Sequence, residues 1–304
     1  MKDATRRDFL KVSGGIAAAL GLSQFKAVDS LAEAKGFEGK GVQVYAFICG
    51  ILKTQTQYIL KDTRIGVPFD IPVPFFLIRH GGSWVAFDTG NNVAVANDNP
   101  AAYWGKGLVE AYKPVMKPYE EFKVQIKKLG LLPKDLKCAI ISHGHLDHAG
   151  AIDNFVGTKV PIYFQKTELE WVKQKLADDT AMKFAYIPGD FKHMNELNIV
   201  EIEGVLDVFG DQSVVAFPTP GHTPGHQSVL VRTERGNMIL SQDACYTLEN
   251  MMASIPPGLA WNVPMSLIPL YTFNIMNAMG AQIVPPHDPD FWKNKSVAPE
   301  PLRL

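Results

Sequence analysis

The sequence predicts one α/β domain built as a four-layer αββα sandwich. Two groups of short apolar runs read as strands, one from Val42 to Asp88 and one from Ile199 to Ser241, and they divide the chain near residue 205. Stretches with helical spacing lie outside both groups. Because each sheet must bury an apolar face, two β-rich halves with outer helices favour two stacked sheets. A chain of 304 residues with 46% hydrophobic and 20% charged residues has enough core for such a domain.

The first half supplies three strands and two helices. The strands are expected at Val42–Ile48, Phe75–Arg79 and Trp84–Asp88, with the turn His80–Gly82 joining the last two. Helical spacing covers Tyr119–Leu129, where apolar side chains share one face and Gly130 ends the helix. A second helix is predicted from Thr167 to about Leu176, with Glu170 at the capping-box position.

The second half adds the later strands and a closing helix at Pro264–Met279. Three segments, 91–117, 178–193 and 248–273, show little regular pattern but are rich in aromatic residues and Met. Segments this apolar are not expected to be disordered. We expect them to form the wall of a substrate pocket or the contact of a possible homodimer.

The most informative motif is the run from His143 to His148, which contains His143, His145, Asp147 and His148. It follows the strand-like run 138–142, so the side chains emerge at the end of a strand. Imidazoles and a carboxylate suit zinc, with iron, cobalt and manganese also possible. The two pairs reach in different directions, and two adjacent metal ions would use all four groups.

Three more potential ligands lie later in the chain. His222, Asp243 and His287 each follow a strand-like run, as the first cluster does. Five of the eight histidines of the chain belong to this set. Side chains at the ends of neighbouring strands can converge on one rigid cleft. The sequence therefore predicts a metal centre with two divalent ions.

These motifs, together with the run Phe87 to Gly90, resemble the five ordered motifs of the metallo-β-lactamase-fold hydrolases over most of residues 40 to 290. The segments Gln227-Ser228 and Asp243 to Thr247 resemble the N-acyl-homoserine lactonases, largely through Tyr246. The resemblance implies a metallo-β-lactamase-type sandwich and a metal-dependent carboxylic ester hydrolase. Its expected reaction is the opening of N-acyl homoserine lactones by a hydroxide that bridges two metals, which would quench bacterial quorum signals.

Each residue then has an expected role. One metal would be held by His143, His145 and His222, the other by Asp147, His148 and His287, and Asp243 would bridge them. Asp147 or a metal-bound water would relay a proton to the leaving group, and Tyr246 would donate to the developing oxyanion. The resemblance places Asp88 behind the ligands as a hydrogen-bonding brace.

Two neighbours of the ligands are expected to be structural. His226 follows His222 by four residues, but Pro224 and Gly225 form a turn between them. Cys245 is two residues from Asp243, and alternation places it toward the core. The three cysteines of the chain give no disulfide framework.

Other substrates remain open for the same two-metal site. They include the substrates of other lactonases or arylesterases and the thioesters of a glyoxalase II-like enzyme, and a di-iron redox protein is a further alternative. The expected substrate is a small molecule with an apolar acyl chain. A net charge of −1 without a basic stripe argues against a nucleic-acid partner.

Residues 1–34 resemble a twin-arginine export signal. Arg6 and Arg7 precede the uncharged stretch Val12–Leu22, which is too short to span a bilayer. Ala32-Glu33-Ala34 provides an A-x-A-like cleavage site, so the hydrolase domain would be residues 35–304. We expect a periplasmic or otherwise exported enzyme with no stable membrane association after cleavage.

Overall fold

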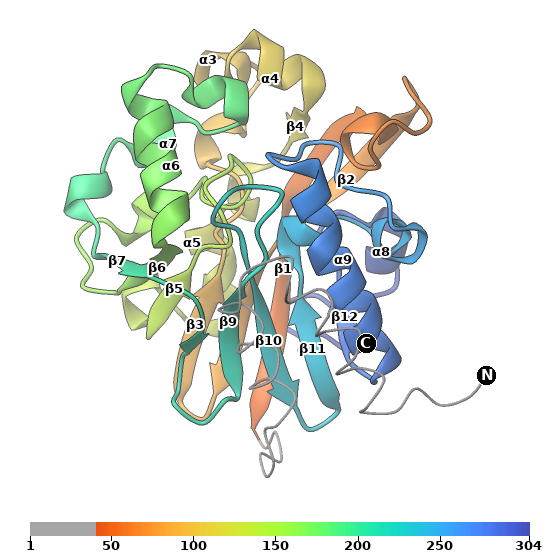
Figure 1. Cartoon of the computed structure of the whole chain (residues 1–304). Coiled ribbons are helices and arrows are strands. Elements are labelled where there is room, and N and C mark those ends of the chain that lie inside the picture. Colours follow the sequence, from red (N-terminus) through yellow and green to blue (C-terminus); the bar gives the residue numbers. More distant parts are fainter. Residues whose placement is uncertain (1–40) are drawn as a thin grey trace.

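The computed structural model describes residues 41–304, and they form two packed β-sheets with helices on both outer faces (Figure 1). Helix α6 (Lys166–Ala177) packs on the first sheet and α9 (Val263–Ala278) on the second. The predicted four-layer αββα sandwich is confirmed.

The first sheet has seven strands in the order β4-β1-β2-β3-β5-β6-β7, and the second has five in the order β12-β11-β10-β9-β8. Every strand of the first sheet precedes residue 203 and every strand of the second follows residue 205, so the predicted division near residue 205 is confirmed. The predicted bounds of the second strand group are wrong, because Ile199–Ile202 pairs within the first sheet and the second sheet also includes Gln282–Val284, beyond Ser241. The strands are β1 (Val42–Gln55), β2 (Pro68–His80), β3 (Ser83–Phe87), β4 (Lys113–Val115), β5 (Cys138–Ile140), β6 (Ile162–Gln165), β7 (Ile199–Ile202), β8 (Leu206–Asp207), β9 (Val214–Pro218), β10 (Gln227–Thr233), β11 (Gly236–Leu240) and β12 (Gln282–Val284).

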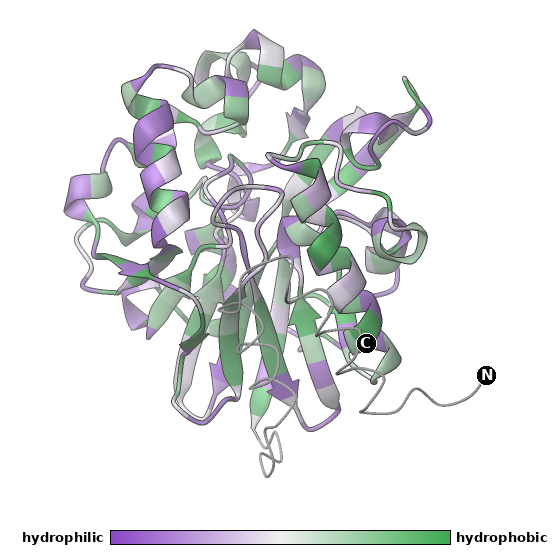
Figure 2. Ribbon diagram, viewed as in Figure 1, coloured by the Kyte–Doolittle hydropathy of each residue, from purple (hydrophilic) through white to green (hydrophobic). Residues whose placement is uncertain are grey.

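Alternating side chains divide the core into three apolar layers. In β1, Val44 and Ala46 point toward the second sheet, whereas Tyr45 and Phe47 point toward the helices on the other face. A third cluster fills the space between the second sheet and α9. The hydropathy colouring shows the same division, with apolar sheets inside and mixed helices outside (Figure 2).

The remaining helices are short, and most of them lie in the three segments for which the sequence predicted no regular structure. They are α3 (Ala101–Trp104), α4 (Lys106–Ala111), α5 (Phe122–Gln125), α7 (Pro188–Phe191), α8 (Leu248–Ala253) and α10 (Pro289–Trp292). Segment 91–117 thus contains α3, α4 and β4, and segment 178–193 contains α7.

Two helix predictions need correction. The single helix expected over Tyr119–Leu129 is interrupted, because Glu121 is extended between a 3-10 turn and α5, although Gly130 ends the segment in the left-handed region as predicted. The capping box at Thr167 and Glu170 does not form. Strand β6 passes directly into α6, so Gln165 occupies the N-cap without a side-chain hydrogen bond, and Glu170 is exposed.

The predicted export signal and its cleavage site lie outside the described residues. Within residues 41–304, no helix is both long and apolar enough to cross a membrane.

Candidate metal centre

The seven predicted ligands meet at one end of the two sheets. His143, His145, Asp147 and His148 lie on the loop after β5, and the other three lie on the loops after β9, β11 and β12. All seven are buried, with exposed fractions of 6% or less. They form two groups suited to metal ions, one of His143, His145, His222 and Asp243, the other of Asp147, His148 and His287.

In the first group three ring nitrogens converge on one point. His222 Nε2 lies 3.1 Å from His143 Nε2 and 3.0 Å from His145 Nδ1. The Nδ1–H of His222 donates to the backbone oxygen of Leu259 at 2.6 Å. A carbonyl oxygen can only accept, so in the neutral ring the lone pair is on Nε2 and faces the other two histidines. Lone pairs that converge on one point repel one another, and a cation bound between them would remove this repulsion.

In the second group, too, a hydrogen-bond acceptor lies behind each histidine. His287 Nδ1 donates to Pro72 O at 2.8 Å, and His148 Nδ1 lies 2.8 Å from Asp88 Oδ2. The Nε2 atoms of these two histidines therefore point inward, where each lies 3.6 Å from a carboxylate oxygen of Asp147. Histidines that bind metals commonly have such a partner on the other ring nitrogen.

Asp243 lies between the two groups. Its Oδ1 is 3.0 Å from His148 Nε2 and 3.1 Å from His287 Nε2, whereas its Oδ2 is 3.1 Å from His222 Nε2 and 3.5 Å from His143 Nε2. Each oxygen thus serves a different group, which is the geometry of a bridging carboxylate.

The electrostatics of the two groups differ. Burial lowers the pKa of His143 and His145, which favours the neutral imidazole that binds metal. Burial also acts to lower the pKa of His148 and His287, but the charges of Asp243 and Asp147 outweigh it and raise both. The second group therefore favours a positive charge among its carboxylates, and a divalent cation meets that need.

Asp88 braces the ligand loop as the resemblance implies. Its carboxylate accepts from Ser142 N at 2.6 Å, from Ser142 Oγ at 2.7 Å and from the side-chain amide of Gln242, in addition to its contact with His148. Asp88 therefore ties the loop after β5 to the loop after β11, and it belongs to neither ligand group.

Tyr246 overlooks the site. Its hydroxyl lies 3.3 Å from His222 Nδ1, and its ring centroid is 5.4 Å from that of His222 and 5.2 Å from that of His287. Burial and the charge of Asp243 raise the pKa of the Tyr246 phenol well above its ordinary value, so it stays protonated and able to donate. Tyr246 therefore lies beside the ligand histidines of both groups, and its role as a donor to the substrate stays a prediction.

His226 and Cys245 have structural contacts. His226 Nδ1 lies 2.8 Å from Thr219 Oγ1, and its ring packs 5.1 Å from that of His143. The Cys245 thiol donates to Thr247 O within the core between the second sheet and α9. Neither residue belongs to a ligand group, so both expectations agree with the structure.

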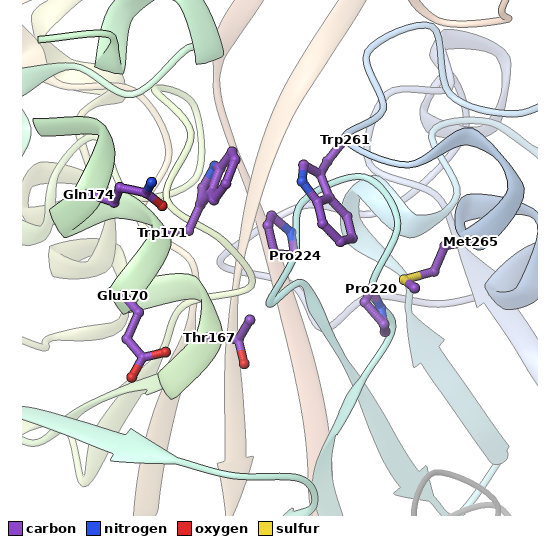
Figure 3. A pocket seen from close by; sticks show the side chains of 8 residues that line it. All are labelled: Thr167, Glu170, Trp171, Gln174, Pro220, Pro224, Trp261 and Met265. Carbon is purple, nitrogen blue, oxygen red and sulfur yellow. The ribbon is translucent and has the colours of Figure 1, made fainter. Parts of the chain in front are cut away.

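An apolar groove of about 410 Å³ borders the loop that carries His222. Trp171 of α6 and Trp261 line it together as an edge-to-face pair, with ring centroids 6.3 Å apart (Figure 3). The groove is lined by Thr167, Glu170, Trp171, Gln174, Pro220, Pro224, Trp261 and Met265. In segment 91–117, burial raises the pKa of the Tyr112 phenol, and the charges of Asp147 and Asp243 add to this effect.

One buried residue of the site was not predicted from the sequence. Glu168 of α6 is fully buried and accepts hydrogen bonds from both histidine loops. Glu168 lies four positions before Val172 on the buried face of the helix, and an acidic residue on that face is the signal that could have identified it. Within this helix only Glu170 was predicted to have a role, as part of the cap.

Comparison with known proteins places the chain in a family. Residues 69–275 match the model of the metallo-beta-lactamase superfamily. The N-acyl homoserine lactonase AttM of Rhizobium radiobacter is 37% identical over 85% of this chain and 98% of the relative, and that of Azorhizobium caulinodans is 35% identical over 85% and 97%.

A solved structure of an N-acyl homoserine lactone hydrolase, with the product N-hexanoyl-L-homoserine at its catalytic metal centre, superposes with a TM-score of 0.74. It is 27% identical and covers 85% of this chain and 98% of that structure. The chain therefore belongs to the metallo-beta-lactamase superfamily, where the proteins that it resembles are N-acyl homoserine lactonases.

Proposed function

We propose that this protein is a metal-dependent lactonase that opens the ring of N-acyl homoserine lactones. The observation that carries the proposal is the position of Asp243, whose two oxygens face two separate ligand groups. Relatives with this function match the chain over 85% of its length. They favour a lactonase over the thioesterase and di-iron redox alternatives.

We assign one zinc ion to each ligand group, because three imidazoles, or two imidazoles and a carboxylate, suit this cation. Two such ions supply a nucleophile at neutral pH and polarise the carbonyl of an ester. Hydrolysis adds water across the ring ester, so the ring C–O bond breaks and a carboxylate and an alcohol form. Tyr246 donates to the carbonyl oxygen as its charge develops, and Asp147 passes a proton to the leaving oxygen.

We infer that the acyl chain of the substrate lies in the groove lined by Trp171 and Trp261, beside this pair of rings. The groove is apolar on the sides formed by these rings, Met265 and two prolines, and it borders the loop that carries His222. Burying a chain there gains roughly 0.8 kcal/mol per CH₂ group. Longer chains should therefore bind more tightly until the groove is filled.

Mass spectrometry of a long-chain N-acyl homoserine lactone incubated with the zinc-loaded protein tests the proposal. A product heavier by one water, absent after chelation, is the expected result. An unchanged lactone, with zinc confirmed on the protein, would exclude this substrate and move the assignment to another ester or thioester.

We further propose that residues 1–34 direct export by the twin-arginine route, because a pair of arginines precedes a short apolar stretch and a small-residue cleavage site. Replacing Arg6 and Arg7 with Lys should retain the protein in the cytoplasm. Cell fractionation and sequencing of the mature N-terminus, expected at Lys35, check this. Equal export of the variant would refute the route.

A further inference from the structure

A single carboxylate joins the two loops of the first ligand group. Glu168 Oε1 accepts from Gly144 N at 2.9 Å and from Tyr186 Oη at 3.0 Å. Its Oε2 accepts from Thr223 Oγ1 at 2.6 Å and from Gly225 N at 3.1 Å. Gly144 lies between His143 and His145, and Thr223 follows His222, so every ligand histidine of this group is next to a partner of Glu168.

The backbone of both loops is pressed against α6. A Cβ atom on Gly225 would lie 2.2 Å from the backbone nitrogen of Glu168, and one on Gly144 would lie 2.7 Å from a methyl carbon of Val172. Only glycine permits such approaches. Helix α6 is therefore a common support for two loops that are far apart in the sequence.

We propose that Glu168 is a positioning residue that sets the distance between the His143–His145 loop and the His222 loop, and thereby the geometry of the first metal site. The inference rests on the proposed metal centre. It goes beyond that proposal because Glu168 belongs to neither ligand group and was assigned no step of the reaction.

An ionised carboxylate fits this position better than any other side chain. It offers about four acceptor sites and no donor, which matches four donors. A glutamine would present an NH₂ group to one pair of donors. On either side that pair includes a backbone N–H, which cannot turn away. The second ligand group is held by Asp88 and Pro72 instead, so a change at Glu168 should act on one of the two metals.

The test is a titration of the metal-free full-length protein with Zn²⁺ in competition with a chromophoric chelator. The wild type should take up two Zn²⁺ in two steps. Glu168→Gln should weaken one step by about 10- to 100-fold, the range for loss of a partner behind a metal ligand, and leave the other unchanged. Asp88→Asn should weaken the other step, and the double variant should be weak in both.

Two further variants separate positioning from folding. Thr223→Val removes one donor to Glu168 while keeping side-chain shape, and it should weaken the same step as Glu168→Gln to a smaller extent. Asp190→Asn changes another buried carboxyl group, which is bonded to Tyr103, and should leave both zinc steps unchanged. Circular dichroism confirms that each variant is folded.

Unchanged zinc binding in Glu168→Gln, or equal weakening of both steps, would overturn the role of Glu168 without affecting the proposed lactonase. A wild type that binds no Zn²⁺ would remove the metal centre and the proposed function together. If Glu168→Gln does not fold, the zinc titration of Thr223→Val provides the test. Zinc binding by this variant equal to that of the wild type would also overturn the positioning role of Glu168.

Discussion

Asp88 Oδ2 lies 2.8 Å from His148 Nδ1, and both side chains are fully buried. This pair fixes the orientation of the His148 ring, so that the opposite nitrogen faces Asp243 at 3.0 Å. Asp88 has a positive φ of 62°, in a region where Asp and Asn are tolerated better than most residues. A ligand is thus oriented by a residue whose own backbone is in an uncommon conformation.

Asp88→Asn should keep the fold, because Asn accepts this backbone conformation, and should weaken metal binding. The amide has one acceptor oxygen for four donated hydrogen bonds, so His148 loses part of its support. The expected loss in affinity is about 10- to 100-fold. Chelator competition measures it, and an affinity equal to that of the wild type would contradict the bracing role.

Asp243→Asn should remove the link between the two ligand groups. The change takes away the negative charge shared by four histidines, so metal content should fall below two ions per chain. Hydrolysis should fall by more than the roughly 100-fold expected for an outer partner. Metal analysis beside the rate of lactone opening checks both. A metal-depleted variant that retained activity would rule out a bridging Asp243.

The convergence of the seven predicted ligands could be predicted because it depends on local sequence. Each ligand follows a short apolar strand, and residue type alone marks His and Asp as ligands at these places. Parallel and antiparallel strands then bring their ends together at one edge. His143 Nε2 therefore lies 3.1 Å from His222 Nε2, although the two residues are 79 positions apart in the sequence. The division into two sheets near residue 205 was predicted from two separate groups of strand-like runs, but Ile199–Ile202 was counted in the wrong group, because its pairing with the first sheet is a tertiary contact.

Features that depend on tertiary contact were not predictable. The spacing over Tyr119–Leu129 fits a helix, yet Glu121 is extended and ends the first turn there. The sequence at α6 fits a capping box, but the chain enters the helix straight from a strand. The contacts of Glu168 were not predicted, because its partners come from two loops that only the fold brings together.

Asp190→Asn should change how stability depends on pH. Burial raises the pKa of Asp190 well above its ordinary value, so the folded protein holds this proton more tightly than the unfolded chain does. The free energy of unfolding therefore declines as pH rises from the ordinary value of 3.8 through the raised pKa. Asn has no proton to lose and keeps an acceptor for Tyr103. Urea denaturation at acidic, neutral and basic pH should show the variant gaining stability relative to the wild type as pH rises. Parallel curves would contradict the assignment.

Tyr246→Phe should separate chemistry from metal binding. The phenyl ring preserves the packing beside His222 and His287, so zinc content and the unfolding temperature should stay close to those of the wild type. Loss of the hydroxyl removes one donor to the developing oxyanion, which lowers kcat by about 10²- to 10³-fold. KM should change little, because the hydrogen bond strengthens only as charge develops on the carbonyl oxygen. Steady-state kinetics on one lactone give both constants. An unchanged kcat would reduce Tyr246 to a packing residue, and a parallel loss of zinc would show that its contact with His222 supports the ligand rather than the reaction.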